Sequence, residues 1–210
     1  MPQTELLIAF FLAAGVFAYI PGPSMLYAAA QTISRGQRAG AIAALGIHIG
    51  GYVHVLAAAL GLAFLFDAVP VLYVALKFGG AVYLIWLGFK MFTSKSESSL
   101  AELKIEPKDA KRAFWESITV EILNPKTAIF YVAFLPQFTD PSATLPIWGQ
   151  LLVLGTIVNV MFSSADVFCV VLADRVTKFF KQSRTASKLA QRLGGGILVG
   201  LGLNIAFSRH

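Results

Sequence analysis

Residues 113–138 read AFWESITVEILNPKTAIFYVAFLPQF, a mostly apolar stretch with a proline inside it. It is long and apolar enough to cross the ~30 Å hydrocarbon core of a bilayer as a helix. Pro125, near its middle, removes a backbone donor and clashes with the carbonyl four residues back. Lipid offers no replacement partner, so non-helical backbone survives in a membrane only against protein or a water-filled cavity. We therefore predict a broken transmembrane helix whose break, Asn124-Pro125-Lys126, faces the inside of the protein.

A matching break, Pro21-Gly22-Pro23, interrupts the first apolar stretch, 5–33. As a straight helix this stretch would be roughly 43 Å long at 1.5 Å per residue, which exceeds the ~30 Å core. A kink that serves only packing is the alternative to a broken helix that lines a path. Six spans are predicted in all, and the chain is expected to be an all-α integral membrane protein. The spans are 5–33, 40–66, 70–92, 113–138, 145–173 and 189–207.

The charged residues fit a membrane protein with one basic side. Of the 210 residues, 57% are hydrophobic and 13% charged, against about 25% charged in a soluble domain. The connections after the first, third and fifth spans, with their flanks, hold 14 of the 17 Lys and Arg residues. The positive-inside rule puts these connections in the cytoplasm and both termini outside. We therefore interpret the net charge of +6 as membrane anchoring and not as binding of nucleic acid.

The chain is expected to form one membrane domain built from two similar halves, 1–92 and 113–210, joined by a polar cytoplasmic linker at 93–112. Each half has three spans, and the first span of each is broken by proline. The third spans also begin alike, with Lys77-Phe-Gly-Gly-Ala81 and Arg192-Leu-Gly-Gly-Gly196. An odd number of spans inserts the second copy upside down, which predicts an inverted repeat with a binding site at the interface of the repeats. Chance similarity among glycine-rich spans is the alternative.

Lys126 and Glu121 carry charge inside the fourth span. The break lies about 11 residues, or ~16 Å, into the span, near the middle of the membrane. A lysine there costs ~2.5–3.5 kcal/mol on insertion scales, so it needs a partner or a wet cavity. Glu121 is close in sequence and shares a helix face with Ser117 and Asn124. We expect either a role in binding substrate or moving a proton, or an ion pair that pins the broken helix.

Asn159, Ser163 and Asp166 form a second polar stripe, at i, i+4 and i+7 of the fifth span. Ionisable residues inside a membrane are functional candidates by default, so Asp166 is a candidate for coupling export to protons. The alternative is a set of helix–helix hydrogen bonds, which are worth only ~0.6 kcal/mol on average in membranes.

The histidines of the second span are expected to be packed or hydrogen-bonded, and the glycines to serve helix packing. His48 and His54 are six residues apart and lie on different faces of the second span, which is a poor spacing for a shared metal. Gly46-xxx-Gly50 permits close helix approach. Gly196-xxx-Gly200 does the same within the chain or at the face of a homodimer. We expect no metal, no cofactor and no enzyme activity, because the sequence contains no GxSxG, HExxH or Walker A motif.

Three stretches together resemble a known family. IPGPSMLYAAAQTISRGQRAGAIAALGIHIG (20–50), KFGGAVYLIWLGFKMF (77–92) and ILNPKTAIFYVAFLPQFTDP (122–141) look like the lysine exporter / homoserine-threonine resistance (LysE/RhtB) family. The resemblance implies a bacterial inner-membrane protein that exports amino acids or close derivatives, coupled to protons by antiport. Residues 21–23 and 124–126 match the broken-helix motifs of that family, and Gln137 belongs to its PQF motif.

The sequence departs from the family in two places. The family often has an aspartate after the glycines of the second span, where this chain has Gly51 and Tyr52. It often has a glycine and an asparagine ahead of NPK, where this chain has Ser117 and Glu121. Two other functions stay open at this point: export of a metal or another small ion, and a membrane protein that assembles or senses without transporting.

Overall fold

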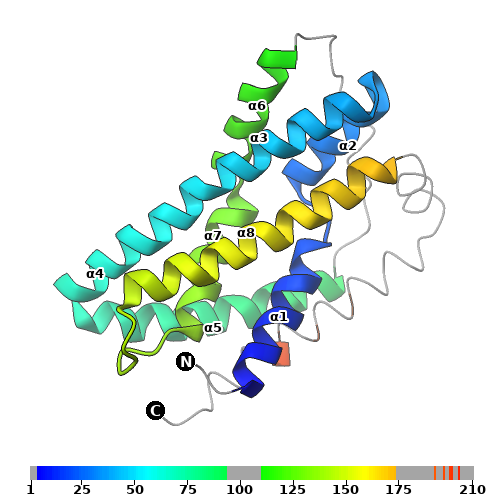
Figure 1. Cartoon of the computed structure of the whole chain (residues 1–210). Helices are drawn as coiled ribbons and strands as arrows, with labels where there is room; N and C mark the ends of the chain where they lie inside the picture. Colours follow the sequence, from blue (N-terminus) through cyan, green and yellow to red (C-terminus); the bar gives the residue numbers. More distant parts are fainter. Residues whose placement is uncertain are drawn as a thin grey trace.

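The computed structural model describes residues 4–93 and 110–173, together with positions 192, 196, 199, 200 and 203. Every regular element in the described residues is helical (Figure 1). The helices are α1 Thr4–Ala18, α2 Pro23–Arg35, α3 Gln37–Leu56, a π-helical segment Ala57–Leu62, α4 Ala63–Ala68, α5 Pro70–Thr93, α6 Ala110–Ile122, α7 Pro125–Phe134, a 3₁₀ turn Leu135–Phe138, and α8 Ile147–Val171.

Two helices of the described residues are long and apolar enough to cross a membrane alone, namely Gln37–Phe66 and Ile147–Val171. Two bent pairs pass the same criterion together. Leu6–Ala18 and Pro23–Arg35 meet at 47°, and Lys111–Ile122 and Pro125–Phe138 meet at 43°. The structure thus supports two membrane spans, or four if each bent pair is one span. The predicted third span coincides with a helix, α5. The predicted sixth lies almost entirely outside the described residues, so six spans and the inverted repeat stay predictions.

Both predicted breaks are confirmed, and the residues explain them. The residue before a proline is pushed out of the helical region by the proline ring. Gly22 and Asn124 take this place, with extended backbones at φ −124°, ψ 177° and φ −73°, ψ 105°. Pro23 and Pro125 then begin the next helix, where their missing N–H is no loss. The Asn124 side chain caps α7 by accepting a hydrogen bond from the backbone N–H of Lys126 at 3.1 Å.

The glycine pair of α3 brings this helix against α6, as the spacing predicted. A Cβ at Gly46 would lie 2.7 Å from the carbonyl oxygen of Phe114, and a Cβ at Gly50 would lie 2.8 Å from that of Ile118. Only glycine allows this approach of the two backbones. α3 lies between α6 on one side and α8 on the other, so it joins parts of the chain that are far apart in sequence (Figure 1).

We expect Gly50→Ala to lower the thermal unfolding midpoint in detergent, because the added methyl would push α6 away. Overpacking costs typically ~1–3 kcal/mol, or on the order of 2–10 °C for a chain of this size. Gly79→Ala in α5 is the matched control, since a Cβ there has nothing within 4 Å among the described residues. Its midpoint should hold or rise, because alanine favours helix. An equal fall of the unfolding midpoint in both variants would contradict the close contact of α3 with α6 at Gly50.

The distribution of polar and apolar side chains is the reverse of that in a soluble protein. Large apolar side chains face outward, with Phe64 and Val71 each 74% exposed. Ser24, Gln31, Glu121 and Asp166 are buried. The interior also holds aromatic rings of α1 and α7 that stack on one another. Outward apolar faces suit lipid, and inward polar groups suit a path through the protein.

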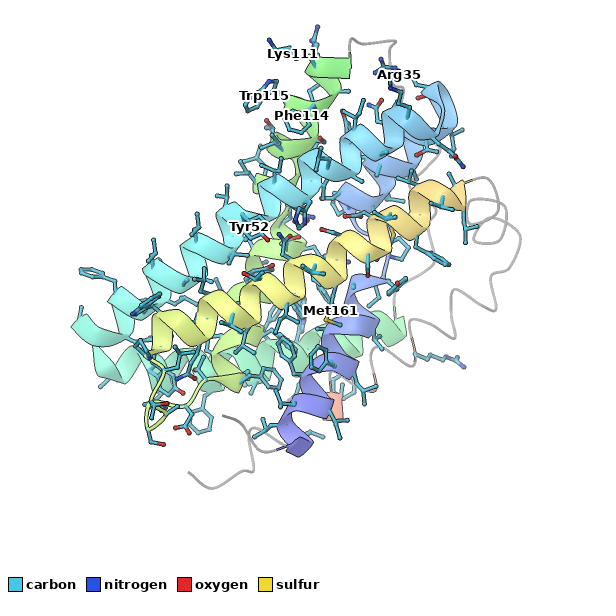
Figure 2. The ribbon with its side chains drawn as sticks, in the orientation of Figure 1. Arg35, Tyr52, Lys111, Phe114, Trp115 and Met161 are labelled. Carbon is cyan, nitrogen blue, oxygen red and sulfur yellow. The ribbon has the colours of Figure 1, made fainter. Side chains whose placement is uncertain are left out.

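The ends of the helices separate by charge. Arg35, at the end of α2, and Lys111, at the start of α6, lie at the same end of the molecule (Figure 2). The turn between α4 and α5 lies at the other end (Figure 1). This arrangement agrees with basic connections that share one side of the membrane, and the orientation itself stays a prediction.

Candidate functional site

A small cavity lies where the two breaks meet, with a volume of about 30 Å³. α2, α3, α7 and α8 contribute to its wall, together with the ends of α1 and α6. Six of the ten predicted site residues line it. They are Gly22, Glu121, Asn124, Lys126, Asn159 and Asp166.

The first contact across the breaks is a triad of polar side chains. The Ser24 hydroxyl donates to the Glu121 carboxylate. The Asn124 amide nitrogen donates to the Ser24 oxygen at 2.9 Å and to the Glu121 carboxylate at 3.2 Å. All three side chains are buried. The triad therefore joins α2 to the end of α6, and the Glu121 carboxylate already has two donors.

Lys126 holds the end of α1. Its Nζ donates to the carbonyl oxygens of Phe17 at 3.2 Å and Ile20 at 2.5 Å, and lies 4.6 Å from the Phe17 ring centroid. The Phe17 carbonyl would normally bond the N–H four residues on, but that residue is Pro21. The ammonium thus fills a place that the break created, and its positive charge suits the negative end of the α1 dipole.

Gly22 makes room for this lysine. A Cβ at Gly22 would lie 2.8 Å from Lys126 Cδ and 3.3 Å from Nζ. The sequence offered Glu121 as the partner of Lys126. No ion pair joins the two side chains in the described residues. Glu121 instead bonds Ser24 and Asn124, and Lys126 bonds the carbonyls at the end of α1.

The polar stripe of α8 divides into two parts. The Asn159 amide donates to the His48 carbonyl at 3.1 Å, and the Ser163 hydroxyl donates to the Asn159 carbonyl at 2.8 Å. Ser163 also contacts His48 Nδ1 at 2.6 Å. Asp166 is only 5% exposed, lines the cavity, and has no hydrogen-bond partner among the described residues. Asn159 and Ser163 thus connect α8 to α3, whereas the Asp166 carboxylate lines the cavity with no hydrogen bond to the described part of the chain.

Two helix N-termini point their first residues at the same cavity. Gly22, Ser24 and Met25 line it from the start of α2, and Lys126 and Thr127 line it from the start of α7. The first N–H groups of a helix lack partners inside the helix and carry partial positive charge. The cavity therefore combines features that attract an anionic group with a carboxylate that attracts a cationic one.

Comparison with known proteins identifies the family. The LysE type translocator family matches residues 16–209. The chain belongs to this family of membrane transporters. Related proteins include the leucine efflux proteins of Klebsiella pneumoniae, 30% identical over 93% of this chain and 92% of the relative, and of Enterobacter sp., 32% identical over 89% and 88%. The membrane protein YrhP of Bacillus subtilis is 31% identical over 96% of this chain and 99% of its own length. No solved structure matches the chain.

As a LysE type translocator the protein is a multi-pass membrane transporter and not an enzyme. This removes the alternative of a membrane protein that does not transport. In the described part of the chain no group of three or more His, Cys, Asp and Glu residues could hold a metal ion.

Four predicted residues of the translocator do not line the cavity. Pro21, Pro23 and Pro125 shape the breaks that surround it. Gln137 is buried in the 3₁₀ turn after α7, where its amide donates to the Ala133 carbonyl at 3.0 Å and packs against Gly80. Whether any of the ten residues acts in transport stays a prediction.

Sequence reasoning missed other residues of the wall, notably Ser24, Thr127 and Phe162. Ser24 follows the PGP motif directly, and Thr127 follows NPK directly. Side chains that follow a break sit in the first turn of the new helix, so their position could have been used. Phe162 shows no such signal, because it is one apolar residue among many in α8.

Proposed function

We propose that this translocator exports amino acids, with leucine and similar aliphatic amino acids as the first candidates. The observation that carries the proposal is the cavity where both breaks, two helix N-termini and the buried Asp166 carboxylate meet. In transporters with broken helices, half-helix N-termini face anionic groups of the substrate. The relatives named leucine efflux proteins support the choice of substrate.

The cavity offers a partner for each part of an amino acid. The N-termini of α2 and α7 would bind its carboxylate, and Asp166 would bind its ammonium group. Met25, Ile47 and Phe162 supply an apolar part of the wall for an aliphatic side chain. The Glu121 carboxylate is already bonded to Ser24 and Asn124, so we assign it to holding the site in shape.

The cavity is too small for an amino acid. A volume of about 30 Å³ holds a water molecule or two, whereas small-molecule sites measure ~300–1,000 Å³. Substrate must therefore enter by a movement of the helices around the breaks. We propose that the two predicted halves, 1–92 and 113–210, move against each other and expose the cavity to one side at a time.

Protons are the coupling ion that the contacts favour. In other transporters the carbonyls at an unwound helix end coordinate Na⁺ or H⁺. Here the carbonyl oxygens of Phe17 and Ile20 already accept hydrogen bonds from the Lys126 ammonium, so they are not open to Na⁺. That leaves Asp166 as the group able to take up and release a proton, and we propose proton antiport through it. No step in this scheme needs a cofactor.

The proposed location is the bacterial inner membrane, with both termini in the periplasm. Reporter fusions at His210 and Ser98 measure this directly. We expect a periplasmic signal from His210 and a cytoplasmic signal from Ser98, because the basic residues cluster in the connections on one side. A cytoplasmic His210 would contradict an even number of spans with the termini outside. The mass of the purified protein would show separately whether it forms a homodimer.

Counterflow tests the choice of substrate. Proteoliposomes loaded with one unlabelled amino acid should take up a trace of the same labelled amino acid if the protein exchanges it. We expect exchange of leucine and related aliphatic amino acids above protein-free vesicles. We expect little exchange of aspartate or glutamate, since a second carboxylate would face Asp166 or the apolar wall. Absence of exchange across the 20 amino acids would contradict the proposed function.

A further inference from the structure

The carbonyl of Glu121 receives a hydrogen bond from the other half of the chain. In an unbroken helix this carbonyl would accept from the N–H four residues on, but that residue is Pro125. It accepts instead from the Asn124 N–H at 3.0 Å and from Nε2 of His54, in α3, at 2.8 Å. Since a carbonyl only accepts, the imidazole must carry its hydrogen on Nε2.

The same arrangement occurs at the first break, with the halves exchanged. The Phe17 carbonyl, freed by Pro21, accepts from the Ile20 N–H at 3.3 Å and from Lys126 Nζ at 3.2 Å. At each break, the carbonyl four residues before the first proline therefore binds one N–H from its own turn and one side chain from the opposite half. Lys126 of the second half serves the first break, and His54 of the first half serves the second.

The sequence places His54 for this contact. Gly46, Gly50 and His54 follow one another at intervals of four, so they share one face of α3. The glycines bring this face against α6, with a Cβ at Gly50 meeting the Glu121 Cβ at 3.0 Å. His54 is 8% exposed, and its ring centroid lies 6.0 Å from that of the buried Tyr131 in α7. The imidazole thus lies between the end of α6, which it bonds, and the Tyr131 ring of α7.

We propose that His54 is a positioning residue for export. Its Nε2–H fixes the last turn of α6, so that the Glu121 side chain on that turn stays directed at Ser24 and Asn124. The proposal rests on the function proposed above. It predicts that the hydrogen-bond donor at position 54 matters, and not only the volume of the side chain.

Two variants of similar size separate these roles. His54→Gln keeps an N–H donor that can reach the Glu121 carbonyl, and His54→Met fills the space without one. We expect His54→Gln to keep most of the leucine export rate. We expect His54→Met to export leucine roughly three- to tenfold more slowly, which is the effect of losing one hydrogen bond. The thermal unfolding midpoint of His54→Met should also fall below that of His54→Gln.

His48 provides the matched control pair. It lies in the same helix and bonds a side-chain hydroxyl, Ser163, which also donates to the Asn159 carbonyl. His48→Gln and His48→Met should differ less in export rate and unfolding midpoint than His54→Gln and His54→Met do. The proposal is wrong if the export rate and unfolding midpoint of His54→Met equal or exceed those of His54→Gln. It is also wrong if the advantage of Gln over Met is as large at position 48. The unfolding midpoints decide this even if the wild type exports no amino acid, so the two proposals can fail separately.

Discussion

Lys126→Met is expected to abolish export. The change removes both donors to the Phe17 and Ile20 carbonyls. It also removes the positive charge from a cavity that holds two carboxylates. Each charge-assisted hydrogen bond is worth ~1.5–3 kcal/mol, so we expect a loss of roughly hundredfold or more in the export rate. The measurement is efflux of labelled leucine, normalised to the folded protein recovered in detergent.

Two further variants show what the lysine does. Lys126→Arg keeps the charge but not the point-like geometry that fits beside Gly22, and we expect partial activity. In Lys126→Met/Glu121→Gln both charges are gone. A direct ion pair would let this neutral double variant recover export, but the two side chains have separate partners, so we expect it to stay inactive. Export at the wild-type rate by Lys126→Met would contradict the assignment of Lys126 to the site.

Asp166→Asn is expected to separate exchange from coupling. The neutral amide keeps the shape of the side chain but cannot carry a proton through the cycle. Counterflow, which needs no net proton movement, should continue at a reduced rate because the ammonium of the substrate loses its ion pair. Accumulation of leucine against its gradient in response to pH should fall to the level of protein-free vesicles.

Glu121→Gln is the matched comparison for Asp166→Asn. A glutamine oxygen can still accept from Ser24 and Asn124, so we expect coupling to survive. If Asp166→Asn still concentrates leucine in response to pH, Asp166 is structural. If Glu121→Gln is the variant that loses coupling, the proton path runs through Glu121 instead.

The breaks could be predicted from the sequence because their cause is local. A proline affects the residue before it and the carbonyl four residues back, wherever the helix lies. For the same reason Gly46 and Gly50 indicated close packing of α3 before its partner was known. In both cases a few neighbouring residues carry the whole argument.

The partners of the polar side chains could not be predicted, because they depend on the packing of distant helices. Glu121 is five residues from Lys126, yet its donor Ser24 is 97 residues away. The spacing of Asn159 and Asp166 puts them on one face of α8, but only the tertiary structure shows that Asn159 is bonded to α3 and Asp166 is not. His54 was expected to be packed or hydrogen-bonded, and its link to the second break depends on where α6 ends.

Efflux from proteoliposomes loaded with labelled leucine, with and without an imposed pH gradient, measures export through this cavity directly. We expect vesicles with the wild-type protein to release leucine faster than vesicles with Lys126→Met and protein-free vesicles. Release should accelerate when the outside is made more acidic than the inside, because protons that enter drive leucine out. Leucine release no faster than from protein-free vesicles, under either condition, would contradict the claim that this translocator exports leucine through the cavity between its two broken helices.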